Sequence, residues 1–190
     1  LSVEQGISII GNYKYVKSVN APKDSITLLM INGNGSIIGA DNIPIAFNNN
    51  QLIGVIYNRY DNQIKGNFKL NCNKFDLEGI TACINPNGDI FVGVTFSDSI
   101  KLGAEQYISS KGGKDIFMLK ISKNGSVIGV KHYGGVQDET VVELLADSKN
   151  LFIGGNLIGP LTNTEIGKIQ FKSFYPVFKT FCSVTRLLRN

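Results

Sequence analysis

The sequence predicts an all-β fold built from antiparallel hairpins, and composition and internal repetition both support this. The chain has 21 glycines but only 5 prolines, and it is rich in Asn and β-branched residues, which favours strands joined by tight turns. One ten-residue pattern has Ile in third place, Asn-Gly in sixth and seventh place and two apolar residues at its end. It occurs as LMINGNGSII from Leu29, ACINPNGDIF from Ala82 and LKISKNGSVI from Leu119. Because type I′ turns need positive φ at both central residues, Asn-Gly between apolar β-formers predicts a hairpin in each copy.

The predicted hairpins are of two kinds that alternate along the chain. The first kind is expected at Ser25–Gly39, Gly79–Thr95 and Thr140–Asn156. The second kind is expected at Gly6–Val19, Leu52–Phe68, Ile116–Tyr133 and, with a looser match, Ile166–Thr180. One hairpin of each kind makes a four-stranded unit of about 50 to 60 residues, which is the size of a β-propeller blade.

The segment Asp138–Ser148 also fits a second interpretation. Asp138 could cap a helix whose apolar face would include Val141 and Leu145. The equivalent segments of the other copies, near Thr27 and Ile80, have the composition of strands. The repeat therefore favours a strand in this segment.

The repeats divide the chain into blade-sized parts. We expect the second half of a preceding blade at 1–24, blades at 25–75, 76–135 and 136–182, the last diverged in its C-terminal half, and a tail at 183–190. Three and a half blades cannot close a propeller of the usual four to eight. We therefore expect part of a larger closed propeller, whose terminal blades are covered by further blades of the same chain or by protein partners.

A longer pattern surrounds the third copy of the repeat. It reads D-x-F-x-x-K-x-x-x-x-G, then Tyr-Gly-Gly, an acidic pair and an apolar strand ending in Gly-Gly, and its residues are Asp115, Phe117, Lys120, Gly125, Tyr133, Gly134, Gly135, Asp138, Glu139 and Leu151–Gly155. This pattern resembles the bacterial SBBP-type β-propeller repeat. The match is good over Gly79–Gly159 and degraded over Ser25–Phe68 and after Pro160. The resemblance implies a seven-bladed wheel and an exported, cell-envelope or extracellular location, but no activity.

Charge and cysteine content argue against several classes of protein. The net charge of +4 includes no basic run, which gives nucleic-acid binding no special support. The single His and three separate cysteines make a zinc site improbable, and we expect no metal or other cofactor. Buried free thiols are the default expectation for Cys72, Cys83 and Cys182, although one disulfide bridge stays open. No apolar run reaches the roughly 18 residues of a membrane span.

Two long connections are candidate binding loops, because propellers bind ligands through loops at one rim. They are Ala40–Asn50 and Phe96–Lys114. The second connection carries the candidate contact residues Lys101, Glu105, Tyr107 and Lys111. A solvated connection explains the same charged residues, and we favour that interpretation.

Three further features could carry chemistry, but each has a structural explanation. His132 is expected to be a structural residue at a strand end rather than a general base. Asp138 and Glu139 are neighbours on a strand and should point to opposite faces, so they should not converge as an acid–base pair. The Gly-Gly pairs at 112–113, 134–135 and 154–155 are not followed by helical patterns, which favours turns or close packing over phosphate binding.

The C-terminal stretch FKSFYPVFKTFCSVTRLLRN is aromatic and basic. Its candidate partner contacts are Phe174, Tyr175 and Phe178. A diverged final hairpin followed by a short extension is the simpler explanation.

Together these patterns predict a structural or protein-interaction domain without enzymatic activity, placed in a bacterial envelope, surface or extracellular assembly. The leading alternative is a glycan-binding or small-ligand-binding propeller that uses loop aromatics such as Tyr107 and Tyr133. A propeller hydrolase or lyase is a third hypothesis.

Overall fold

A computed structural model describes residues 2–4, 7–72, 74–102, 106–156, 162–164 and 180–186. Every regular element in these ranges is a β-strand, and all strand pairs are antiparallel, which confirms the predicted all-β class. The described ranges contain no helix that could span a membrane.

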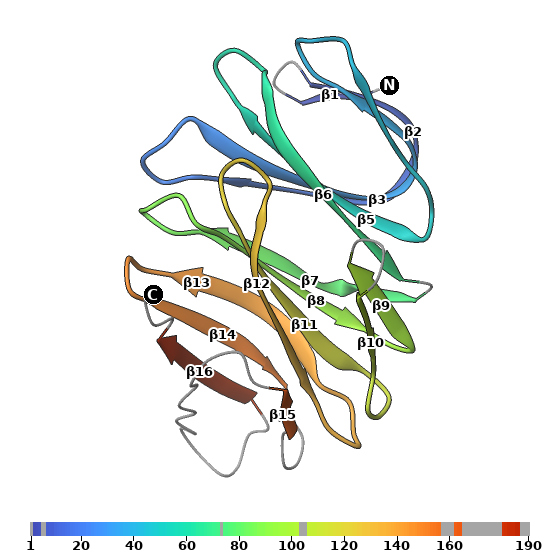
Figure 1. The fold of residues 1–190 in the computed structure, drawn as a ribbon, viewed down its shortest axis with the longest axis vertical. Coiled ribbons are helices and arrows are strands. Elements are labelled where there is room, and N and C mark those ends of the chain that lie inside the picture. Colours follow the sequence, from blue (N-terminus) through green and yellow to red (C-terminus); the bar gives the residue numbers. More distant parts are fainter. Residues whose placement is uncertain are drawn as a thin grey trace.

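The strands form three sheets (Figure 1). Sheet A contains β1 (Ser2–Glu4), β2 (Ile7–Asn20), β3 (Ile26–Ile38), β4 (Pro44–Phe47), β5 (Gln51–Asn58), β6 (Ile64–Cys72), β9 (Ser99–Leu102) and β10 (Gln106–Ser109). Sheet B contains β7 (Phe75–Ile84), β8 (Ile90–Phe96), β11 (Asp115–Ile121), β12 (Val127–Gly134) and β15 (Thr162–Thr164). Sheet C contains β13 (Thr140–Ala146), β14 (Asn150–Asn156) and β16 (Thr180–Arg186).

The sheets stack face to face, with sheet B in the middle (Figure 1). One core cluster lies between sheets A and B and includes Met30, Leu52, Val92 and Phe117. A smaller cluster lies between sheets B and C, where Met118 of β11 is joined with Val141 of β13. Alternating side chains of β11 thus enter different clusters, so sheet B is buried on both faces.

Four of the predicted hairpins are confirmed. Gly79–Thr95 corresponds to β7 and β8, and Thr140–Asn156 corresponds to β13 and β14. Leu52–Phe68 corresponds to β5 and β6, and Ile116–Tyr133 corresponds to β11 and β12. The strand predicted within Asp138–Ser148 is confirmed as β13, while Ile166–Thr180 lies almost wholly outside the described residues.

The turns of two confirmed hairpins are wider than the expected type I′. Gly88 and Gly125 each have a φ of 85°, whereas the preceding Asn87 and Asn124 are not among the residues with positive φ. In the second turn Gly125 N donates to Ser122 O at 3.0 Å, and the strands resume pairing only at Ile121 and Val127. This arrangement is typical of a type I turn followed by a glycine bulge.

The hairpins predicted within Ser25–Gly39 and Gly6–Val19 are wrong, because each segment is one continuous strand. β3 runs through Asn34-Gly35 since it has partners along its whole length. β2 pairs with one edge of β3, while β5 and then β4 pair with the other edge. These ladders satisfy the backbone groups that a turn would leave unpaired.

Residues 1–24 therefore do not begin a separate sheet, because Ile7–Asn20 pairs with Ile26–Ile38 inside sheet A. The chain leaves sheet A after Cys72 and enters sheet B at Phe75, near the expected boundary at 75/76. It leaves β12 after Gly134 and enters sheet C at Thr140, near the boundary at 135/136. The assignment of these sheets to propeller blades stays a prediction.

The two long connections also contain strands. Ala40–Asn50 includes β4, which pairs with the distal half of β3. Phe96–Lys114 includes the hairpin of β9 and β10, and β9 pairs with β6 at the edge of sheet A. The chain between two strands of sheet B thus extends sheet A and joins the two sheets.

A hairpin tip also joins sheets A and B. A Cβ atom added to Gly66 of β6 would lie 2.1 Å from the backbone oxygen of Asn124, at the tip of the β11–β12 hairpin. Such a distance is far below van der Waals contact, so only glycine fits at position 66 with this tip in place.

Candidate functional site

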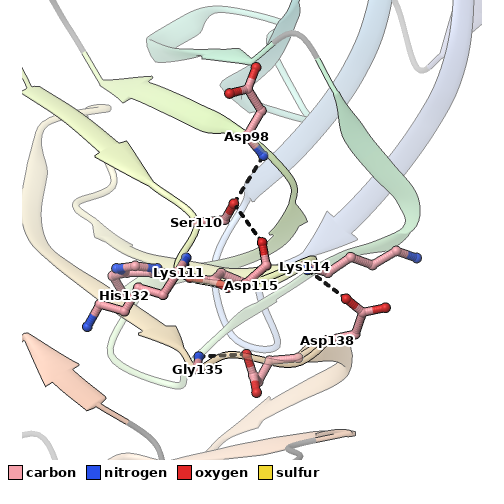
Figure 2. Close-up of polar contacts among 10 residues, drawn as sticks. Asp98, Ser110, Lys111, Lys114, Asp115, His132, Gly135 and Asp138 are labelled. Carbon is pink, nitrogen blue, oxygen red and sulfur yellow. Dashed lines mark hydrogen bonds and ion pairs between the residues drawn. The ribbon is translucent and has the colours of Figure 1, made fainter.

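The main group of polar side chains lies where β11 begins and β12 ends. We call it the polar corner and define it as Ser110–Asp115, His132 and Gly135–Glu139. Figure 2 shows the polar corner with Asp98, whose N–H donates to Ser110 Oγ at 3.2 Å. These residues hold the connection that enters β11 and the connection that leaves β12 for sheet C.

A buried aspartate–histidine pair forms the interior of the polar corner. Asp115 Oδ2 lies 2.6 Å from His132 Nε2 and also accepts a hydrogen bond from Lys111 N at 2.9 Å. The Asp115 residue is fully buried and His132 is 5% exposed. The ring of Phe96 lies beside the imidazole, with 5.8 Å between centroids. Burial of both partners makes this pair costly to break, because the remaining group would be left in a dry site.

Glycine is required next to this pair. A Cβ added to Gly134 would lie 1.8 Å from Asp115 Oδ2. A Cβ added to Gly112 would lie 2.6 Å from Gly135 O. These contacts confirm close packing at Gly112 and Gly134, one member of each of the two Gly-Gly pairs.

The neighbours Asp138 and Glu139 point apart, although they lie in the connection before β13 and not on a strand as predicted. Asp138 is exposed, and its Oδ1 accepts a hydrogen bond from Lys114 N at 2.9 Å. Glu139 is fully buried, and its Oε2 accepts a hydrogen bond from Gly135 N at 2.8 Å. Each carboxylate therefore holds the backbone of a different connection, and the two do not converge on one acid–base site.

An ion pair links the polar corner to β7. Lys114 Nζ lies 2.6 Å from Asp76 Oδ2. The hydrogen bond from Lys114, with its charge, lowers the pKa of Asp76 below the usual 3.8, although partial burial opposes this shift. The same pair raises the pKa of Lys114 above 10.5. Both side chains keep solvent contact, so the pair is a minor source of stability.

An aspartate–histidine pair can orient a general base, but nucleophilic catalysis also needs a hydroxyl or thiol at the imidazole. In the part of the chain that the structure describes, no serine or cysteine side chain is hydrogen-bonded to His132. The same residues include no group of three His, Cys, Asp or Glu side chains that could hold a metal ion.

The described cysteines lie far from a reactive environment. Cys72 and Cys83 are free and buried, in the core clusters on opposite faces of sheet B. Burial raises the pKa of Cys72 to about 11 and that of Cys83 to about 12. Thiols with such values are poor nucleophiles near neutral pH. The side chain of Cys182 lies outside the described residues.

The sequence-predicted contact residues do not form one surface. Lys101 and Tyr107 meet on the β9–β10 hairpin, where the Lys101 ammonium lies 4.8 Å from the Tyr107 ring centroid. Tyr107 is 65% exposed, whereas Tyr133 is buried in the cluster between sheets B and C and is no exposed platform for a glycan. Lys111 is exposed at the polar corner. The remaining predicted residues lie outside the described ranges: Glu105, Phe174, Tyr175 and Phe178.

The partner of His132 was not predicted, although the hairpin register identifies it. Phe117 pairs with His132 across the β11–β12 ladder, so Asp115 is the diagonal neighbour of His132 on the same face. Counting outward from the Asn124-Gly125 turn would have brought the two together.

Comparison of the chain with known protein families, curated proteins and solved structures finds no match.

Proposed function

We propose that this protein is a non-enzymatic scaffold or protein-interaction domain built from propeller-like sheets. The main support for the proposal is that the carboxylates of the polar corner bind the protein's own backbone. Its carboxylates accept hydrogen bonds from backbone N–H groups, namely Lys111 N, Lys114 N and Gly135 N. Because these carboxylates order turns, rearranging them for a substrate would disrupt two connections.

The stacking of the sheets supports the same proposal. Sheet B has apolar clusters on both faces, as a blade has between its neighbours in a propeller. The scaffold interpretation needs no ligand pocket, because the outer surfaces of stacked sheets and their connections are sufficient for contacts with other proteins. A bacterial envelope, surface or extracellular setting belongs to the proposal through the resemblance to the SBBP-type repeat alone.

A binding assay with a fractionated bacterial envelope tests the proposal. The purified chain would be mixed with envelope extract, and the mass of any complex would be measured by light scattering after gel filtration. We expect a discrete complex that is lost when the extract is treated with protease and retained when it is treated with glycosidases. A glycan-binding function would replace the scaffold proposal if three results were found together. The complex would survive protease treatment of the extract, free sugars would compete with it, and Tyr107→Ala would abolish it.

The polar corner provides a second arm of this test. Asp115→Asn should lower the free energy of unfolding and leave complex formation by the folded fraction unchanged. Tyr107→Phe is the matched surface control and should change neither quantity. An Asp115→Asn protein that keeps full stability and loses a hydrolytic activity present in the unaltered chain would contradict the proposal.

A further inference from the structure

Sheet A carries apolar side chains on both of its faces. In β3, Leu28 and Met30 belong to the cluster shared with sheet B, whereas Leu29 and Ile31 belong to a separate cluster. β5 alternates in the same way, and all six of its central residues are buried. Neighbouring residues on a strand point to opposite faces, so the separate cluster lies on the face of sheet A that is turned away from sheet B.

The chain covers this second face with its own strand ends. The cluster includes Ile7 and Ile9 from the start of β2, Ile37 from the end of β3 and Phe47 from β4, all between 0% and 4% exposed. Figure 1 shows β2 and β3 curving away from the rest of the sheet toward β1. We call this folded-over half, 7–12 with 34–47, the curl.

Glycines allow the strands to bend at the curl. Gly11 has a φ of 132°, a conformation that residues with a side chain rarely adopt. A Cβ on Gly35 would lie 2.1 Å from the backbone oxygen of Ile10, and the register shifts between Tyr13 and Tyr15. A bulge and closely opposed glycines are the devices by which sheets acquire sharp curvature.

The outer side of the curl differs from its inner side. Asn12, Lys14 and Asn34 are exposed and polar, and Ala46 is exposed and small. The apolar exceptions are Ile43 and Ile10, at 63% and 44% exposure. A unit with one apolar face toward its neighbour and one polar face toward solvent is what terminates a stack of repeats and keeps it soluble.

We propose that the curl is a built-in cap that occupies the stacking face of sheet A. While the curl is closed, no further sheet, from this chain or from a partner, can pack on Leu29, Ile31 and Ile53. Partners of the stack must therefore approach elsewhere, and a propeller ring cannot close through this face unless the curl opens. This inference rests on the packing of sheet A and goes beyond the proposed scaffold function.

Thiol labelling tests the cap in the full chain, with Cys72, Cys83 and Cys182 replaced by Ala. Val55→Cys places one thiol beneath the curl, and Val94→Cys places another between sheets A and B; both valines are fully buried. The cap is weakened by Ile9→Glu, which buries a charge in the curl. The matched control is Ile10→Glu, because the adjacent side chain points outward and is 44% exposed.

We expect both thiols to label slowly in the starting protein. Ile9→Glu should accelerate labelling at position 55 by on the order of ten- to a hundredfold and leave position 94 within about twofold, because only the curl opens. Ile10→Glu should change neither rate. Ile9→Ala provides a milder version if the charged variant fails to fold, with the same direction of effect.

Other outcomes would overturn the inference. Rapid labelling at position 55 in the starting protein would show that the face is open. Equal acceleration at positions 55 and 94 in both cap variants would show that the curl is not a separable cover. Neither result would bear on the envelope-binding assay, so the cap and the scaffold function can fail independently.

Discussion

The two ends of the stack of sheets differ in how their outer faces are treated. At one end, sheet A is buried on both faces, by sheet B on one side and by the curl on the other. At the other end, Val141 and Leu144 of sheet C face sheet B, while Val142 and Leu145 on β13 are 64% and 59% exposed. Among the described residues, the outer face of sheet A is therefore covered, whereas Val142 and Leu145 leave an exposed apolar surface on sheet C.

Strand length explains much of this difference. β2 and β3 have 14 and 13 residues, whereas β13 and β14 have 7 each. The additional residues of sheet A form the curl, which buries aliphatic side chains that would otherwise contact water. An apolar outer face is therefore acceptable where the strands are long enough to fold back over it.

The largest expected change in the free energy of unfolding is at the outer face of sheet A, and a variant on the outer face of sheet C provides the comparison. Ile53→Ala, beneath the curl, should lower the free energy of unfolding by about 2–5 kcal/mol, because it leaves a cavity in a closed cluster. Leu145→Ala, on the open face of β13, should change it by less than about 0.5 kcal/mol. Urea denaturation of both variants measures the two values. Similar losses would show that the outer face of sheet C is as well covered as that of sheet A.

A second effect concerns the connection between sheets B and C. Glu139→Ala should lower stability by about 1.5–3 kcal/mol, because the buried carboxylate no longer caps Gly135 N. Its neighbour provides the control: Asp138→Ala removes an exposed acceptor and should have an effect of about 0.5 kcal/mol. Thermal and urea denaturation would detect the difference. A larger loss in Asp138→Ala would mean that the exposed carboxylate is the one that orders the corner.

A smaller effect, at the middle sheet, depends on pH. The lowered pKa of Asp76 means that its pair with Lys114 contributes fully above pH 3.8 and is lost as the pH falls through the folded-state value. Solvent screening limits this contribution to under about 1 kcal/mol. Lys114→Met should therefore flatten the acid limb of the stability curve, measured by urea midpoints from neutral to acidic pH. If the acid limb of Lys114→Met were the same as that of the starting protein, the loss of stability at low pH would have to come from other carboxylates.

The smallest effect is kinetic. Cys72 lies in the larger cluster between sheets A and B, and Cys83 lies in the smaller cluster between sheets B and C. Both thiols should resist labelling near neutral pH, because burial raises their pKa values to about 11 and about 12. Labelling then requires local opening, and the smaller cluster around Cys83 should open more readily than the larger cluster around Cys72. Cys83 should therefore label faster than Cys72 when each rate is divided by the rate in the unfolded chain, with peptide mapping to separate the sites. The reverse order would show that the cluster between sheets A and B opens before the cluster between sheets B and C.

The Asn-Gly signal predicted a hairpin correctly only where the two strands beside it pair with each other. Asn87-Gly88 and Asn124-Gly125 meet this condition, and both form turns. Asn34-Gly35 does not, because β2 pairs with one edge of β3 through both residues and β4 pairs with the other edge from Gly35 onward. A local turn signal is a weak preference, which the pairing of a long strand with its neighbours overrides.

The polar corner was partly predictable for similar reasons. The separation of Asp138 from Glu139 was predicted, but from strand alternation that does not apply, because both residues precede β13. The hairpin register could have joined Asp115 to His132. The curl was not predictable, because the burial of Ile9 against Ile53 depends on how one sheet bends in space. A period-2 pattern shows that a strand has an apolar face, but it does not show what covers that face.

The contact between Gly66 and the tip at Asn124 has a practical consequence for engineering. Hairpin tips are the usual places to insert an epitope tag or a fluorescent label, since exposed tips tolerate additional residues. An insertion at Asn124-Gly125 would be driven into β6, where the existing backbone contact leaves no room for even one carbon atom. The tip that carries Tyr60 is also held, by hydrogen bonds from Arg59 N to Ser25 O at 2.9 Å and from Ala40 N to Asn62 O at 3.1 Å. A reporter there is better attached to the side chain at position 60, which is 77% exposed, than inserted into the backbone.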